Sequence, residues 1–308
     1  MKYFFLAIVA FIGINSIAQQ TTPRKLLLRD EGASQLAYVD LKDSSANWYV
    51  PIPAGRDMQL VGNGRVLIGT NNGYEERDIR NGNKLSEITG FPGTVSARRL
   101  RDGNTMLVGV NWQNQKGIVL VEVNSRGEIQ RQTIYPGFNY VRLLRETPSG
   151  NFLISSNDTV LEGNAAGKIL WLAKISSQKQ PHAWQALRLK NGNTLVSAGY
   201  AGNMQLFSPE GKPLGIITGP DEIKPNFYAG YQILPDGNIM VINWQGHGPN
   251  MGAKGNQLLE YNMDGKLLWS WKQDAAHFSS LHAVIVLDQL DPAFLHVEDE
   301  NGMLKAVR

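Results

Sequence analysis

The sequence predicts an all-β protein, a single β-propeller built from four-stranded blades. Two sets of short repeats carry this prediction. The glycines of the first set are spaced by 39, 47, 42 and 45 residues. In each copy a Gly-Asn turn or a close variant leads into an alternating apolar strand, and because Gly and Asn tolerate positive φ, each copy predicts a hairpin. The copies stand at 62–70, 101–109, 148–156, 190–198 and 235–243.

A second set of turns lies out of phase with the first and predicts a hairpin between a third and a fourth strand. Four antiparallel strands recurring every 40–45 residues or so are typical of a propeller blade. Trp171 and Trp269 each follow the Gly of such a turn by four residues, and Trp48 holds the matching place near the N-terminus. We expect all three rings to pack between neighbouring blades. The copies are at 80–87, 124–130, 164–171, 208–215 and 262–269.

The blade count follows from how the two ends of the chain fit together. Residues 25–52 resemble the last three strands of a blade, and residues 281–287 resemble a first strand. Joining them closes the ring and removes exposed sheet edges. Six blades are therefore favoured, with seven as the alternative because the tail at 293–307 is left over. The five whole blades are expected at 55–91, 93–137, 138–177, 179–219 and 220–274.

The N-terminus predicts export. Lys2 precedes an apolar run at 3–14, and Ser16-Ile17-Ala18 offers a signal-peptidase site. We expect a signal peptide at 1–18, cleavage after Ala18, a short linker at 19–24 and the propeller at 25–308. The chain has no cysteine, so it offers no lipidation site or thiolate metal site. We expect a periplasmic or secreted protein, with no integral membrane segment after cleavage.

The charge distribution of the sequence limits which classes of partner are expected. Net charge is +3 and the basic residues are scattered, without a basic run interleaved with aromatic residues. Nucleic acid is therefore not expected as a partner. The sequence leaves the oligomeric state open.

The pattern Gly-Lys-x-Leu-Trp at 164–171 and 262–269 resembles the tryptophan-containing repeat of quinoprotein-like propellers. The chain is also similar to exported propellers of Bacteroidetes-type bacteria, which carry Asn-Trp-Gln-Gly-His, here residues 243–247, followed by a strand like 257–269. That group has no assigned chemistry, so the resemblance implies fold and export. Quinone enzymes of this superfamily use larger rings, a cysteine pair and carboxylate calcium ligands, which this chain lacks. No cofactor is predicted.

Candidate site residues gather in the loops that enter the first strand or leave the second strand of a blade, because these loops share one face of a propeller. Two of these loops contain Asn-Trp-Gln, 132 residues apart, which places them on opposite sides of a six-bladed ring. The predicted ligand-binding residues are Asn111, Trp112, Gln113, His182, Trp184, Tyr228, Asn243, Trp244, Gln245, His247 and His282.

Aromatic rings and amides at one face suit a glycan or a peptide, since rings stack on apolar ligand faces and amides both donate and accept hydrogen bonds. In the other interpretation, Trp112 and Trp244 pack onto neighbouring blades and the amides cap strand ends. We expect a binding or scaffold protein of the cell envelope without catalytic activity. The alternative is a carbohydrate-active lyase or hydrolase that uses His182, His247 or His282 as acid, base or metal ligand.

Overall fold

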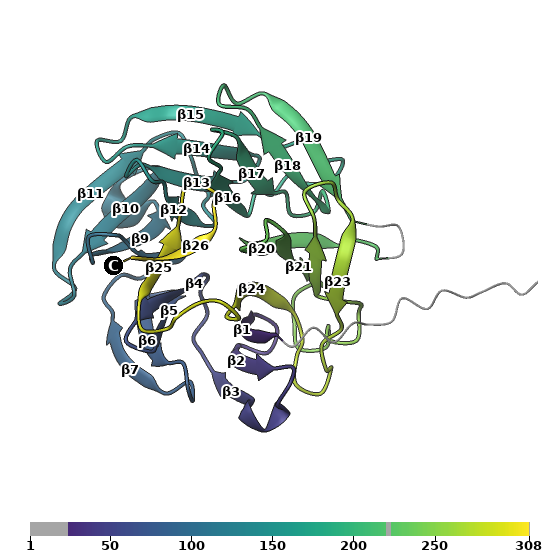
Figure 1. Ribbon diagram of the computed structural model, residues 1–308. Helices are drawn as coiled ribbons and strands as arrows, with labels where there is room; N and C mark the ends of the chain where they lie inside the picture. Colours follow the sequence, from purple (N-terminus) through teal and green to yellow (C-terminus); the bar gives the residue numbers. More distant parts are fainter. Residues whose placement is uncertain (1–23, 220–222, 308) are drawn as a thin grey trace, which may run out of the picture.

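The computed structural model describes residues 24–219 and 223–307, and they form a β-propeller of six blades around a central channel (Figure 1). The predicted signal peptide, its cleavage site and residues 19–23 of the predicted linker lie outside the described residues. The two helical segments are single 3-10 turns, η1 (Ser44–Ala46) and η2 (Trp112–Asn114). Within the described part of the chain, no helix has the length and apolar character needed to cross a membrane.

Each of the five predicted whole blades is present, with its innermost strand first. Blade 1 holds β4 (Met58–Gly62), β5 (Arg65–Thr70), β6 (Gly73–Asp78) and β7 (Lys84–Ile88). Blade 2 holds β8 (Ser96–Arg99), β9 (Thr105–Val110), β10 (Ile118–Val123) and β11 (Ile129–Tyr135). Blade 3 holds β12 (Leu144–Glu146), β13 (Phe152–Ser156), β14 (Thr159–Gly163) and β15 (Ile169–Lys174).

The remaining two whole blades follow the same antiparallel order. Blade 4 holds β16 (Gln185–Arg188), β17 (Thr194–Ser197), β18 (Asn203–Phe207) and β19 (Pro213–Thr218). Blade 5 holds β20 (Phe227–Ile233), β21 (Ile239–Trp244), β22 (Leu258–Tyr261) and β23 (Leu267–Trp271).

The ring is closed by strands from both ends of the chain, as the sequence predicts. In this closing blade, the innermost strand β24 (Leu281–Val286) pairs with β1 (Lys25–Asp30) in antiparallel register, with Leu26 opposite Val286 and Leu28 opposite Val284. β2 (Gln35–Asp40) and β3 (Trp48–Pro51) complete it.

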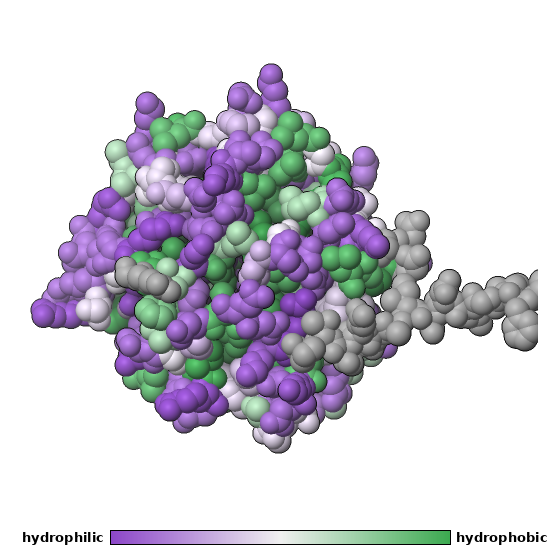
Figure 2. All heavy atoms as spheres, viewed as in Figure 1, coloured by the Kyte–Doolittle hydropathy of each residue, from purple (hydrophilic) through white to green (hydrophobic). Residues whose placement is uncertain are grey.

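The seven-blade alternative is wrong, because the tail does not build a blade. Residues 295–307 form a hairpin, β25 (Leu295–Glu298) and β26 (Leu304–Val307), that joins blade 1 on the channel side of β4. Figure 1 shows this hairpin crossing the centre of the ring. Gly302 in its turn approaches Leu187 and Ile233 of blades 4 and 5, so the hairpin spans the channel. In the same view, Figure 2 shows a mostly hydrophilic face whose centre is covered by atoms.

Turn chemistry explains the regular blades. The glycines of the first repeat have φ between 78° and 91° at Gly103, Gly150, Gly192 and Gly237, where a side chain would strain the backbone. In four blades these turns therefore reverse the chain between the first and second strands of the sheet.

The three repeated tryptophans pack between blades, as predicted. Trp48 Nε1 donates to the Ile79 carbonyl of blade 1 at 3.2 Å, and Trp171 Nε1 donates to the Ser208 carbonyl of blade 4 at 3.3 Å. The guanidinium of Arg24 lies 5.4 Å from the centroid of Trp269, across the closing seam. Large rings at one repeated position thus join neighbouring blades at three of the six boundaries.

Candidate functional site

The two Asn-Trp-Gln loops lie on blades 2 and 5, on opposite sides of the ring, but their tryptophan rings are used in packing. Trp112 is partly buried, and its ring covers Gly93 and Gly109, where an added Cβ would come within 2.8 and 2.4 Å of ring atoms. Trp244 is 6% exposed and packs against Phe227 at a centroid distance of 5.2 Å. Trp244 therefore presents little ring surface to a ligand.

The second loop is tied to the closing blade through one carboxylate. Trp244 Nε1 donates to Glu31 at 2.9 Å, and Nδ1 of His247 lies 2.9 Å from the other oxygen of Glu31. His247 itself is exposed at the rim. A residue that the sequence did not single out, Glu31, thus fixes the position of the Trp-Gln-Gly-His segment.

The predicted amides mostly support loop backbone. Asn243 Oδ1 accepts from the backbone N–H of Asn226 at 2.8 Å, and its Nδ2 donates to the Asn256 carbonyl at 3.2 Å. Gln245 Nε2 donates to the Asn243 carbonyl at 2.9 Å, and Asn111 Oδ1 accepts from the Gly117 N–H at 3.0 Å. The side chain of Gln113 lies outside the described part of the structure.

Tyr228 lies in the interior of blade 5 rather than among the mouth side chains. It is fully buried, and its hydroxyl lies 2.8 Å from that of Tyr261. Burial raises the pKa of Tyr228 far above its ordinary value. Its neutral phenol therefore contributes to packing.

His182, Trp184 and His282 do come together, at the centre of the face that carries the loops. His182 Nε2 accepts a hydrogen bond from Arg142 Nε at 2.8 Å and lies 2.9 Å from the hydroxyl of Tyr140. Burial, reinforced by Arg142 and Arg56, lowers the pKa of His182 to about 4. The imidazole is therefore neutral at pH 7, with Nε2 as acceptor.

His282 is the most unusual polar group at this face. It is 3% exposed and stands beside Trp184 at a centroid distance of 6.2 Å. Neither of its ring nitrogens has a hydrogen-bond partner among the described residues, and the same holds for Nδ1 of His182 and Nε1 of Trp184. Burial lowers the pKa of His282 well below its usual value, and nearby arginines add to the effect, so it too is neutral.

Trp184 and His282 line a pocket of about 220 Å³, which we call the mouth pocket. Segments of the closing blade and blades 1, 2 and 4 line it. Two arginines and two carboxylates line it, and a third arginine, Arg142, lies over the lining ring of Trp184. Of the carboxylates, Asp30 is already engaged by the backbone N–H groups of Ser279 and Ser280 at 2.6 and 2.9 Å. The lining residues include Arg29, Glu31, Arg56, Asn71, Trp184 and His282.

Two arginines of the mouth are held without an ionic partner. The Arg56 guanidinium lies 5.5 Å from the centroid of Trp184, and that of Arg142 lies 5.1 Å from it and 4.4 Å from Tyr140. Within the described residues neither arginine forms a direct ion pair with a carboxylate, although burial lowers the pKa of both and Glu31 is near enough to oppose this lowering. Both precede the innermost strand of their blade by two residues, a shared position that could have identified them in the sequence.

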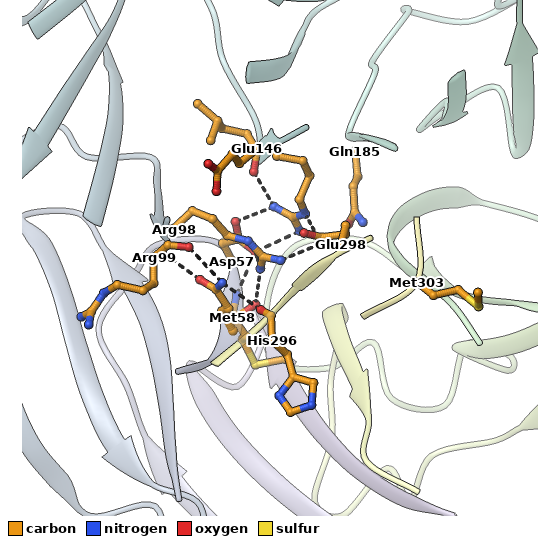
Figure 3. Close-up of polar contacts among 12 residues, drawn as sticks. Asp57, Met58, Arg98, Arg99, Glu146, Gln185, His296, Glu298 and Met303 are labelled. Carbon is orange, nitrogen blue, oxygen red and sulfur yellow. Dashed lines mark hydrogen bonds and ion pairs between the residues drawn. The ribbon is translucent and has the colours of Figure 1, made fainter. Parts of the chain in front are cut away.

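Below the mouth pocket, a second set of arginines is fully paired. Arg145 donates to both oxygens of Asp57 at 2.7 and 3.1 Å, and Arg98 donates to Glu298 at 2.6 Å. Figure 3 shows Asp57, Arg98 and Glu298 meeting, and Glu298 is supplied by the C-terminal hairpin. We call Asp57, Arg98, Arg145 and Glu298 the channel lock. Burial raises the pKa of Glu298, but the two arginines outweigh it and hold the pKa below its usual value.

The histidines are not arranged as metal ligands. Across residues 24–219 and 223–307, no group of three or more His, Asp or Glu side chains is placed to hold a metal ion. His182 and His282 lie near the mouth pocket, whereas His247 is paired with Glu31 at the rim.

The fold is similar to several solved structures. A protein of unknown function from Bacteroides caccae is 24% identical over 87% of this chain and 100% of its own, with a TM-score of 0.70. Virginiamycin B lyase from Staphylococcus aureus is 12% identical, over 86% and 88%, with a TM-score of 0.56. The calcium-binding protein regucalcin from Agrobacterium tumefaciens is 14% identical, over 73% and 84%, with a TM-score of 0.51.

No family model matches the chain, and no curated protein matches its sequence. At these identities the solved structures share the propeller fold with this chain. Its function has to be argued from its own site.

Proposed function

We propose that this protein is an exported, ligand-binding propeller and that a glycan or a peptide binds in the mouth pocket. The observation that carries the proposal is His282, a buried imidazole with two unpartnered nitrogens beside a pocket. A buried polar group without a partner costs about 1–3 kcal/mol. Such a cost is compatible with a stable fold when a ligand supplies the missing hydrogen bonds.

The shape of the channel supports the same proposal. The C-terminal hairpin and the channel lock fill the channel below the pocket, so a ligand enters from the face that carries the Asn-Trp-Gln loops. Glu31 lines the pocket and also holds Trp244 and His247. The Trp-Gln-Gly-His segment therefore supports the pocket wall from behind through Glu31, which agrees with the buried position of Trp244.

A blocked pocket tests the proposal. Ala54 is exposed and lines the pocket, so Ala54→Trp fills the entrance without disturbing the core. Ala166 is exposed on the turn between β14 and β15, and Ala166→Trp is the matched control. We expect a ligand found on glycan and peptide arrays to lose calorimetric binding to Ala54→Trp alone. Equal binding by both variants, or no array ligand at all, would reject the mouth pocket as the site.

A carbohydrate-active enzyme is the second candidate, favoured by the neutral, unpartnered imidazole of His282 in the pocket lining. A neutral imidazole accepts a proton, and it becomes a general base when a bound ligand presents one within hydrogen-bond reach. A structure with a similar fold is a catalytically inactive virginiamycin B lyase variant with quinupristin. To separate an enzyme from a binding protein, the array ligand is incubated with the protein and analysed by mass spectrometry. A product that forms with the wild type but not with His282→Gln supports an enzyme. Unchanged ligand supports binding alone.

A further inference from the structure

We propose that the ligand of the mouth pocket is an acidic sugar whose carboxylate binds between Arg56 and Arg142. This inference rests on the proposed function and specifies the chemical class of its ligand. It starts from two neighbouring arginines whose charge a single carboxylate, Glu31, offsets only in part.

Arg56 and Arg142 converge from different blades on one ring. Arg56 comes from blade 1 and Arg142 from blade 3, and both guanidinium groups lie over Trp184 of blade 4. They are close enough that Arg56 contributes, after burial, to lowering the pKa of Arg142 to about 9. Both remain charged at pH 7. Two like charges held together at a partly desolvated site are costly unless an anion joins them.

The protein uses its own hydrogen-bonding groups only in part at this site. Arg142 is directed at the neutral nitrogen of His182, and Glu31, a pocket carboxylate, is already bonded to Trp244 and His247. The third arginine, Arg29, is satisfied by the carbonyls of Pro53, Asp57 and Gly69 at 2.8–3.0 Å. Burial lowers the pKa of both Arg56 and Arg142 and Glu31 opposes this lowering, but one carboxylate cannot balance two guanidinium groups, so a net positive charge remains on this pair.

The chemistry of the lining favours a carboxylate on a hydroxyl-rich ligand. A guanidinium presents a planar fork of N–H donors that matches a carboxylate. Ser34, Asn71 and Thr94 add hydroxyl and amide groups, while Ile52 and Ala54 supply an apolar wall. At about 220 Å³ the pocket is smaller than the roughly 300–1,000 Å³ of sites for drug-sized ligands, which suits one sugar residue.

A pair of sugars that differ in one group provides the test. D-Galacturonate and D-galactose differ by the carboxylate, and titration of each into the protein is followed by calorimetry. Because hydrogen bonds to a charged group contribute about 1.5–3 kcal/mol, we expect galacturonate to bind at least about tenfold more tightly. Equal affinities for the two sugars would overturn the inference.

Arginine variants assign the effect to the two side chains. We expect Arg56→Gln and Arg142→Gln each to weaken galacturonate binding about tenfold or more. Arg126 is exposed on the turn between β10 and β11, so Arg126→Gln removes the same charge elsewhere and is expected to change affinity less than about twofold. Arg142→Lys keeps the charge without the fork and should be intermediate. Unchanged affinity in both mouth variants, with melting temperatures preserved, rejects the assignment.

The outcomes also separate this inference from the function on which it rests. Suppose that galactose or a neutral peptide binds, that Ala54→Trp abolishes this binding and that Arg56→Gln does not affect it. The proposed binding function would then stand, and the inference of an acidic ligand would be wrong. If the protein instead prefers a Gly-Glu-Gly peptide to galacturonate, and both arginine variants lose this preference, the ligand is an acidic peptide and not an acidic sugar. If no sugar or peptide probe binds, and Ala54→Trp changes no array signal, the proposed binding function itself is rejected.

Discussion

Two sets of arginines lie in the same channel, and they differ in whether carboxylates of the protein pair with them. In the channel lock, Arg98 and Arg145 are buried and share Asp57 and Glu298. At the mouth pocket, Arg56 and Arg142 lie over an aromatic ring without a carboxylate partner in the described structure. Arg142 and Arg145 are only three residues apart, so the difference arises from their surroundings and not from residue type.

The two sets differ in whether the protein supplies their counter-charges. The C-terminal hairpin delivers Glu298 to the lock, and Arg101 Nη2 holds the carbonyl of the same residue at 2.6 Å. No corresponding strand reaches the mouth among the described residues. The charged groups of the lock pair with one another, whereas Arg56 and Arg142 have no direct ion-pair partner among the described residues, and we propose that a ligand supplies one.

The largest expected effect tests the lock against the mouth. We expect Arg145→Ala to lower the free energy of unfolding by about 3–5 kcal/mol, because it leaves the buried Asp57 and Glu298 carboxylates short of a partner. Arg142→Ala removes ring contacts and a repulsion, so about 1 kcal/mol or less is expected. Urea unfolding of both variants measures the difference. Similar losses of unfolding free energy in the two variants would contradict the distinction between the channel lock and the mouth pocket.

The next largest expected effect is a pH dependence of stability that arises from His182. His182 has its pKa lowered from 6.5 to about 4 by burial and by Arg142 and Arg56, so between these pH values the unfolded chain binds a proton that the folded chain does not. Stability therefore falls as the pH drops from about 6.5 toward 4, by about 2 kcal/mol once solvent screening at the open mouth is allowed for.

The variant His182→Gln keeps an acceptor for Arg142 and removes the titration. We expect the difference in unfolding free energy between pH 7 and pH 4.5 to shrink by that amount in the variant. Parallel pH profiles for the two proteins would contradict the assignment to His182. His282 and His296, whose pKa values are also lowered, remain in both proteins and serve as the common background.

The smallest expected effect on stability is also the sharpest test of the mouth. His282→Leu replaces a buried, unpartnered imidazole by an apolar side chain, so we expect unfolding free energy to stay unchanged or rise by up to about 1 kcal/mol. Binding of the mouth ligand should weaken in the same variant. A clear loss of stability would mean that His282 is matched inside the protein and is not reserved for a ligand.

Much of the fold could be predicted because it is encoded by local signals. The two families of Gly turns gave the blade boundaries, and Trp48, Trp171 and Trp269 indicated the contacts between blades. The closing blade followed from counting strands at both ends. The hairpin at 295–307 was ambiguous, since two short strands predict a hairpin but not whether it builds a blade or crosses the channel.

The site was predicted only in part. His182, Trp184 and His282 were recognised from their place in the loops, and they do meet at the mouth. Trp112 and Trp244 stand in comparable loops, yet their rings fill space over glycines and between aromatic residues. A repeat specifies which face a loop occupies, but the rotamer of its side chain depends on neighbours that are distant in sequence.

The sequence by itself determined the all-β class and the strands that close the ring, and it favoured six blades over seven, because turn glycines and alternating apolar residues act over a few residues. Only the tertiary structure decided which arginines are paired. Arg145 meets Asp57 from blade 1 and Glu298 from the end of the chain, while Arg142 meets His182 and Trp184. These contacts span 40 to 153 residues of chain, so the charges of the channel are matched or left unmatched by the closure of the ring.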